Sequence, residues 1–167
     1  MTQLDRIRAA WALLSVETPL KRDCGAVCGA ACCQPDEDGR GGMILFPGEE
    51  ALYDPCPAWA TLAETPIEIQ GRPLLFLACD GRCPRDSRPL ACRIFPLTFT
   101  AVGQGVAVAL DARAWPVCPL MPSGMNGLSG AFAAAVRAAA GVLWADEGCR
   151  AYIKLLTSQA ESYKFLG

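Results

Sequence analysis

The chain has 167 residues, among them 10 cysteines and no histidine, and its formal net charge is −2 at pH 7. Because 52 % of the residues are hydrophobic and only 19 % are charged, the composition is typical of a folded domain and excludes disorder of the whole chain. The lack of histidine excludes serine–histidine and cysteine–histidine catalysis and every metal site with an imidazole ligand. The slightly acidic balance provides no overall positive field, so we expect no nucleic-acid partner.

The amino terminus predicts an amphipathic helix over residues 2–16. Apolar side chains recur at helical spacing from Leu4 to Leu14, Thr2 is suited to cap the helix, and Pro19 is expected to end it. The segment lacks a signal-peptide cleavage site, and no run of about 18 apolar residues occurs, so we expect a cytoplasmic protein without a membrane partner. Cytoplasmic thiols stay reduced, and clustered cysteines there more often bind metal than form disulfides.

The centre of the chain predicts short strands. Residues 43–46 form one apolar segment of strand length. Residues 66–79 and 96–111 each contain two apolar segments joined by a glycine-containing turn, which predicts two β-hairpins. We expect these strands to form a small central antiparallel sheet.

Helices are expected before, between and after these strands. Residues 47–54 predict a short helix whose first turn holds Glu49 and Glu50. We expect these glutamates to cap the helix, with an approach to a metal as the alternative. Two C-terminal helices are predicted at roughly 127–145 and 149–165.

The predicted elements make an α+β fold. Small antiparallel hairpins and a cysteine-rich loop region would be flanked by an N-terminal helix and two C-terminal helices. Residues 1–167 are expected to form a single domain, with a metal-binding cysteine cluster at about 20–120 and a C-terminal helical pair at about 126–165.

The first cysteine group has the spacing C-x3-C-x3-C-C and consists of Cys24, Cys28, Cys32 and Cys33. In a straight helix the outer two of the first three thiols would be about 12 Å apart, whereas one zinc ion holds two thiolates within about 4 Å. Three interpretations therefore stay open: a bend at Gly25 and Gly29, a division of the cysteines between two sites, or a larger object such as an iron–sulfur cluster. The alternative without a metal is that these cysteines are buried and act as small apolar residues.

The second group is carried by a turn-rich segment and consists of Cys79, Cys83 and Cys92. Cys79 and Cys83 flank a tight turn of the kind that holds zinc or iron, and a proline follows Cys83. Four arginines crowd this segment: Arg82, Arg85, Arg88 and Arg93. Guanidinium groups near thiolates would stabilise the thiolates and lower their pKa, although each arginine could equally belong to a solvated loop face.

The remaining cysteines are isolated in the sequence. Cys118 lies between two prolines in a rigid loop and is a candidate ligand. Cys56 lies in a similar proline-flanked segment, and Cys149 opens a predicted helix, where we expect a structural role. The gaps fit neither the radical-SAM triad, the bacterial ferredoxin run nor the thioredoxin C-x2-C motif.

Taken together, CGAVCGAACC, MILFPGEE, LACDGRCPRDSRPLACRIFPL and RAWPVCPL resemble the YkgJ-type cysteine-cluster family. The resemblance covers about residues 20–120 and implies a zinc or iron–sulfur site without a settled activity. By motif position it implies eight ligands: Cys24, Cys28, Cys32, Cys33, Cys79, Cys83, Cys92 and Cys118. A related cluster occurs in enzymes that methylate flagellin lysines, but this chain lacks the length of such an enzyme.

Three classes of function follow as hypotheses. The preferred one is a metal-binding protein with one or two all-thiolate centres, most naturally iron–sulfur clusters such as [4Fe–4S], with a redox or electron-transfer role. The alternative is a structural zinc protein with four-cysteine sites that acts as a module for an unidentified protein partner, or as an accessory to a protein lysine methylase. The third is an iron–sulfur oxidoreductase or an enzyme with a nucleophilic thiol.

Overall fold

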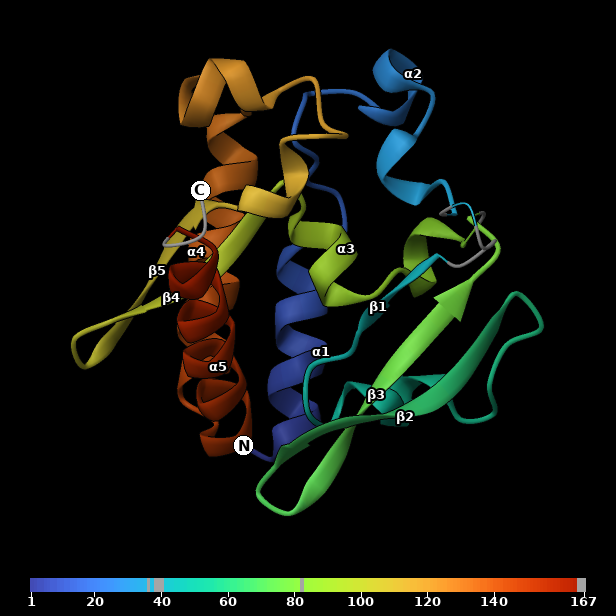
Figure 1. Ribbon diagram of the computed structural model, residues 1–167, viewed down its shortest axis with the longest axis vertical. Coiled ribbons are helices and arrows are strands. Elements are labelled where there is room, and N and C mark those ends of the chain that lie inside the picture. The colour runs from blue at the N-terminus through green and yellow to red at the C-terminus, as the bar shows by residue number, and fades with distance from the viewer. Residues whose placement is uncertain (36, 38–40, 82, 165–167) are drawn as a thin grey trace.

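A computed structural model describes residues 1–35, 37, 41–81 and 83–164 and has the predicted α+β architecture (Figure 1). The α-helices are α1 (Gln3–Leu13), α2 (Gly25–Cys28), α3 (Leu90–Ile94), α4 (Gly130–Trp144) and α5 (Glu147–Lys164). The strands are β1 (Gly42–Ile44), β2 (Ala60–Ile69), β3 (Arg72–Cys79), β4 (Leu97–Val102) and β5 (Gly105–Leu110). Short 3-10 helices are η1 (Ala31–Cys33), η2 (Glu49–Tyr53), η3 (Arg85–Ser87), η4 (Ala112–Ala114) and η5 (Met121–Gly127).

The strands form two separate antiparallel sheets, where the sequence predicted one central sheet. The first has the order β1-β3-β2, with Met43 opposite Leu77, and the second is the β4-β5 hairpin. The β2–β3 hairpin turns at Gln70 and Gly71, which both have positive φ angles (54° and 72°), as a two-residue hairpin turn requires. Both predicted hairpins are therefore present, and the first is longer than expected because β2 begins at Ala60.

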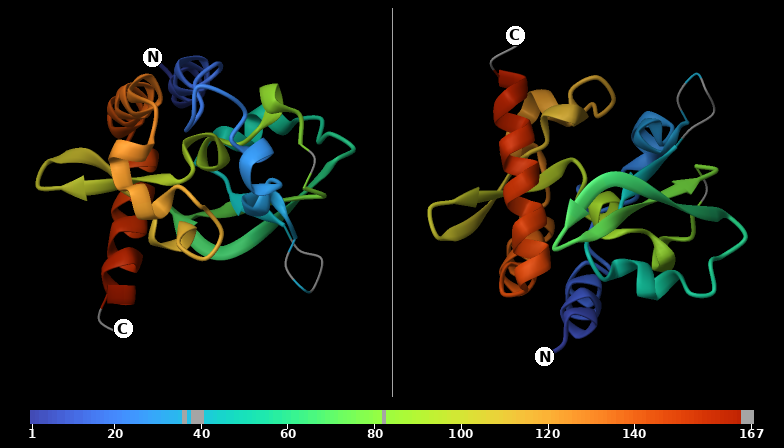
Figure 2. Two further views of the ribbon diagram at one scale, coloured as in Figure 1. Left: turned by 90° about the horizontal axis from the view of Figure 1, so that it is seen from above. Right: turned by 60° about the horizontal axis from the view of Figure 1, so that its bottom comes forward.

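The helix α1 lies between the two parts of the fold. Figure 1 shows α1 with α4 and α5 on one side and the three-stranded sheet on the other. The β4-β5 hairpin extends away from this body next to α5 (Figure 2), where the Thr157 hydroxyl accepts a 2.8 Å hydrogen bond from the Ala101 N–H. The main core joins α1, α3, α4, α5 and β4. At its centre, Phe46 makes edge contacts with Phe99 and Tyr152, at ring-centroid distances of 5.7 and 5.1 Å.

The predicted cap of α1 is confirmed, but its predicted end is wrong. Thr2 and Asp5 form a reciprocal capping box, and the Thr2 hydroxyl accepts a 3.2 Å hydrogen bond from the Asp5 N–H. The helix ends at Leu13, before the expected Pro19. The Ser15 hydroxyl donates to the Ala12 carbonyl at 2.9 Å, and such local side-chain bonds compete with the helical pattern.

The two C-terminal helices lie where the sequence predicted them. The Ser129 hydroxyl caps α4, which buries Phe132, Val136 and Leu143 along one face. Within the described residues, no single helix has the length and apolar character needed to cross a bilayer; η5 and α4 satisfy length and composition only as a pair, and they are bent by 83° at their junction.

Candidate metal centre

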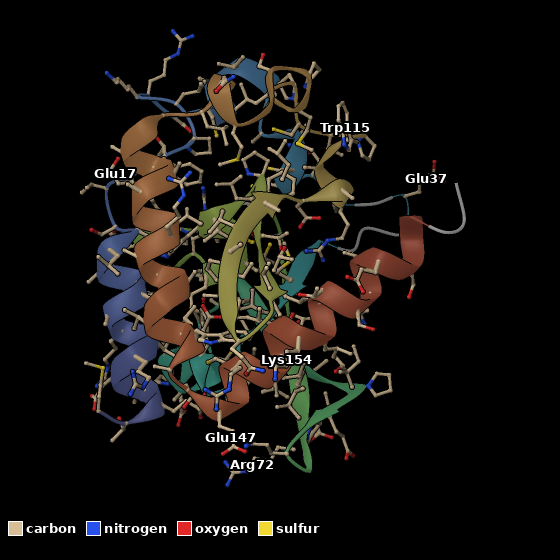
Figure 3. The ribbon with its side chains drawn as sticks, turned by 90° about the vertical axis from the view of Figure 1, so that its left-hand side faces the viewer. Glu17, Glu37, Arg72, Trp115, Glu147 and Lys154 are labelled. Atoms are coloured by element: carbon tan, nitrogen blue, oxygen red, sulfur yellow. The ribbon has the colours of Figure 1, made fainter. Side chains whose placement is uncertain are left out.

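A cavity of about 100 Å³ gathers six of the eight expected ligands from three distant parts of the chain. The cysteines that line it are Cys24, Cys28, Cys32, Cys33, Cys92 and Cys118. They come from the segment of α2 and η1, from α3, and from the loop after η4. Figure 3 places Trp115, in this last loop, at the end of the molecule opposite Arg72 and Glu147. The fold therefore concentrates thiols that lie more than 90 positions apart in the sequence at one end.

The first cysteine group is not a straight helix. The chain turns sharply at Gly29 and Ala30, which have φ angles of 63° and 55°. A bend, which was one of the three interpretations of the spacing, is therefore present at Gly29, whereas Gly25 lies inside α2. Because of the turn, Cys32 and Cys33 lie on a separate 3-10 turn, with their Sγ atoms 3.9 Å apart. That distance equals the spacing of two thiolates on one tetrahedral ion, about 4 Å.

The turn between Cys79 and Cys83 lies against this same 3-10 turn. A Cβ built on Gly81 would be only 2.6 Å from the Cys33 carbonyl oxygen, and Gly81 has a φ of +81°. The Cys79 N–H donates to the Gly41 carbonyl at 3.0 Å, which extends the β3 pairing to the residue before β1. Figure 1 shows α2 and η1 above the carboxyl end of β3. Backbone contacts thus bring the second cysteine group to the first.

Burial and nearby negative charge favour the neutral thiol form of Cys24 and Cys92. Burial raises the pKa of Cys24, and the charges of Cys28, Asp23 and Cys118 raise it further. Burial also raises the pKa of Cys92, with further repulsion from Cys83, Cys33 and Cys79.

The adjacent thiols Cys32 and Cys33 are shifted in opposite directions. A hydrogen bond from the Cys32 thiol lowers the pKa of Cys33 to about 6, and the Arg88 guanidinium lowers it as well. The same hydrogen bond is the main cause that raises the pKa of Cys32. The pair therefore favours one thiolate beside one thiol.

Arg88 lines the cavity beside the thiols. Its burial lowers its pKa, but hydrogen bonding to Cys83 and the charges of Cys83, Cys33 and Cys92 raise it above the ordinary value. Within the described residues, the Nε of Arg88 is buried and has no hydrogen-bond partner. A buried N–H without an acceptor costs about 1–3 kcal/mol, so this donor fits a site in which a thiolate or an inorganic sulfide would accept it.

The other arginines have different roles. Arg93 is buried, and it donates to the carbonyls of Arg88 (2.6 Å) and Asp86 (2.9 Å). Arg85 is exposed and donates to the Glu17 carbonyl at 3.2 Å. Arg82 lies outside the described residues. The arginine-rich segment is therefore neither a uniform solvated face nor a uniform thiolate cradle.

Glu49 holds the helix that carries Cys92, because its carboxylate caps the first N–H of α3 and not the helix η2 to which Glu49 itself belongs. The Glu49 carboxylate is fully buried and makes no capping bond to η2. Instead it accepts hydrogen bonds from Trp11 Nε1 (2.9 Å), the Leu90 N–H (2.7 Å) and the Phe46 N–H (3.0 Å). Burial raises the pKa of Glu49 to about 7.

This network joins α1, η2 and the start of α3. The guanidinium of Arg93 also stacks on the Trp11 ring at 4.3 Å. The sequence did not reveal the network, nor α3 itself, because its partners are 38 and 41 residues apart and no local pattern connects them.

The two cysteines left out of the ligand set lie elsewhere. Cys149 is buried in the main core, where its thiol contacts the Pro47 carbonyl at 3.7 Å, as expected of a structural residue. Cys56 is exposed, and its thiol contacts the Ala60 carbonyl at 3.4 Å. Neither residue lines the cysteine cavity.

The donor set suits a soft metal, but the side chains do not stand in coordinating positions. Thiolates alone suit zinc or iron–sulfur clusters. Across the described part of the chain, no three Cys, Asp or Glu side chains are arranged so that they could hold one ion. Coordination would therefore require the cysteine side chains to leave the positions they have in this structure.

No family model, curated protein or solved structure matches this chain.

Proposed function

We propose that the chain is a metal-binding protein in which the eight cysteines hold all-thiolate centres, most naturally iron–sulfur clusters, with a redox or electron-transfer role. The observation that carries the proposal is the cavity that collects Cys24, Cys28, Cys32, Cys33, Cys92 and Cys118 beside the Nε of Arg88, which has no hydrogen-bond partner in the part of the chain that the structure describes. An iron–sulfur cluster is anionic and several ångström wide, so it can reach thiols that no single ion reaches and can accept the Arg88 N–H through sulfur. When bound, such a cluster would supply one-electron chemistry.

The residues around the thiols also support a bound metal. The short elements that carry the first group and the turn after Cys83, namely α2, η1 and η3, contain no buried residue. Segments that bury so little apolar surface gain little stability from packing, and metal binding can supply that stability. We also propose a cytoplasmic location, where the thiols would stay reduced until metal is inserted.

The decisive experiment is anaerobic purification followed by measurement of iron, zinc and acid-labile sulfide per chain. An iron–sulfur protein will be brown and will contain iron and sulfide in comparable amounts, and its visible absorption will bleach on reduction. The matched control is Cys56→Ser, because Cys56 is exposed and does not line the cavity. Purified chain with no metal, before and after reconstitution with iron and sulfide, would refute the proposal.

A structural zinc protein that binds a protein partner is the second candidate. Val27, Trp115 and Val117 are exposed (50 %, 59 % and 38 %), and both valines line the cavity. Exposed apolar side chains grouped on one surface are typical of interaction sites. Zinc at two ions per chain, without sulfide or colour, would favour this candidate over the first.

A further inference from the structure

We infer that the Nε–H of Arg88 donates a hydrogen bond to a sulfur atom of the bound iron–sulfur centre and thereby raises the reduction potential of that centre. The inference rests on the proposed function and goes beyond it, because it assigns a redox-tuning role to a residue that is not a ligand. Three observations carry it: the place of Arg88 on the cavity wall, the lack of a partner for its Nε, and the way its backbone is held.

Arg88 presents an unused donor at the cavity. It lines the same cavity as the six cysteines. Its Nε atom is buried and has no hydrogen-bond partner among the residues that the structure describes. Buried N–H groups nearly always have an acceptor, so this one indicates an acceptor that the described chain does not provide. Thiolate and sulfide sulfur both accept hydrogen bonds, and a centre held by the cavity thiols would bring such sulfur next to Arg88.

The carboxylates of the cavity wall do not take this donor. They are Glu17 and Asp23, and in the described part of the chain neither forms an ion pair with Arg88. The Asp23 carboxylate instead accepts the Gly25 N–H at 3.1 Å. Among the described residues the wall holds three arginines and these two carboxylates, so positive charge is in excess there. This excess suits an anionic centre.

The backbone of Arg88 is held in place by two other side chains. Three successive carbonyls, those of Asp86, Ser87 and Arg88, accept hydrogen bonds from side chains. Arg93 donates to the first and the third, at 2.9 and 2.6 Å. The Tyr53 hydroxyl donates to the second at 2.9 Å. Arg88 is therefore fixed at the cavity before any centre binds, as is required of a group that acts on a cofactor.

Reduction of the centre would strengthen the hydrogen bond from Arg88. The centre takes up one electron from an external reductant, and the added negative charge makes its sulfur atoms better acceptors. The guanidinium stays protonated in both states, so no proton moves at Arg88. The reduced state is therefore stabilised more than the oxidised state, which raises the reduction potential.

The first test uses the wild-type chain with arginine labelled with ¹⁵N at Nε. The chain is reconstituted with iron and sulfide and reduced with dithionite, and pulsed electron paramagnetic resonance is recorded. We expect a ¹⁵N coupling, because a hydrogen bond to sulfur transfers unpaired spin density to the donor nitrogen. Arg88→Lys should lose the coupling, since lysine has a methylene group in place of Nε. A wild-type spectrum without the coupling, or a coupling that survives in Arg88→Lys, would overturn the inference.

The second test measures the reduction potential by anaerobic titration in the presence of redox dyes. At the midpoint potential of the wild type, Arg88→Lys should have a ratio of reduced to oxidised centre that is about tenfold lower, a shift of about 59 mV for a one-electron couple. Arg85→Lys is the matched control, because Arg85 lines the same cavity but is exposed and donates to the Glu17 carbonyl at 3.2 Å. Its potential should equal that of the wild type. Equal potentials for Arg88→Lys and the wild type would overturn the inference.

The two proposals fail in different ways. A wild-type chain that holds a cluster but shows no arginine coupling refutes only the role of Arg88. A wild-type chain that takes up no cluster refutes the proposed function and this inference together. The wild-type spectrum decides between these outcomes even if a variant does not fold.

Discussion

The carbonyl oxygen of Cys33 lies so close to Gly81 that a Cβ on this glycine would be 2.6 Å from it. The contact joins the two cysteine groups through the backbone, independently of any bound metal. No side chain other than hydrogen fits between the two turns, and the φ of +81° also favours glycine.

Gly81→Ala should therefore separate the Cys79–Cys83 turn from Cys33. We expect the free energy of unfolding to fall by about 2–4 kcal/mol, because the new methyl group adds a backbone clash to the cost of a positive φ. Gly71→Ala is the matched control: Gly71 has a φ of +72°, but nothing lies within 4 Å of a Cβ there, so only about 1 kcal/mol should be lost. Urea denaturation measures both values. Equal losses would contradict the close contact.

Cys92→Ala should lower the metal content of the protein, whereas Cys149→Ala should leave it unchanged. Cys149 is buried and Cys92 is half-buried, so both variants should lose stability, by about 1–2 kcal/mol for the atoms removed. Only Cys92→Ala should also lose metal, because Cys92 is one of the proposed ligands and Cys149 belongs to the main core. Metal analysis of the two purified variants decides the matter. Loss of metal from Cys149→Ala would show that the ligand set is wrong.

Arg93→Lys should destabilise the protein although it keeps the positive charge. Lysine has no guanidinium fork and could not donate to both the Arg88 and Asp86 carbonyls while lying on the Trp11 ring. We expect a loss of about 2–3 kcal/mol, measured by thermal or urea unfolding. Arg72→Lys is the control, because Arg72 is exposed at one end of the molecule (Figure 3) and should change stability by less than about 0.5 kcal/mol. Similar losses for the two variants would mean that the charge alone matters at Arg93.

The buried carboxyl of Glu49 should make stability depend on pH. Burial raises its pKa in the folded chain from 4.5 to about 7. Between these values the folded chain binds a proton that the unfolded chain has released. The stability that this carboxyl contributes is therefore complete below pH 4.5 and is lost as the pH rises through 7. The difference corresponds to about 3 kcal/mol.

Glu49→Gln isolates this effect, because glutamine does not titrate. The variant should be less stable than wild type, since its amide nitrogen cannot accept from one of the three N–H donors. The deficit should be larger at about pH 5 than at about pH 8, as measured by urea denaturation across that range. Glu50→Gln serves as the control, because Glu50 is only partly buried. A deficit that does not change with pH would contradict the raised pKa of Glu49.

The fold could be predicted where a local pattern defines an element. Helix α1, both hairpins and the two C-terminal helices follow from helical spacing, alternation and glycine turns. Helix α3 could not be predicted, because its first N–H is held by Glu49, 41 positions earlier. Next to the end of α1 the Ser15 hydroxyl donates to the Ala12 carbonyl, and such a local bond competes with the helix.

The candidate site was predicted less completely. The cysteine types follow from the sequence, and their spacing gives a bend as one of three alternatives. The grouping of Cys118 with α2, and of Cys33 with the Cys79–Cys83 turn, depends on the three-dimensional fold and has no local signal. The different surroundings of the arginines are likewise set by tertiary contacts. Arg88 lies near thiols, Arg93 donates to backbone carbonyls, and Arg85 is exposed.

The position of Trp11 gives the protein a built-in optical probe. Its indole donates to Glu49 and lies under the guanidinium of Arg93, the residue next to Cys92. In a chain whose other three tryptophans are replaced by phenylalanine, the emission of Trp11 would follow both the ionisation of Glu49 and the arrival of a light-absorbing cluster nearby. Assembly of the centre could then be timed in stopped-flow measurements without any attached dye.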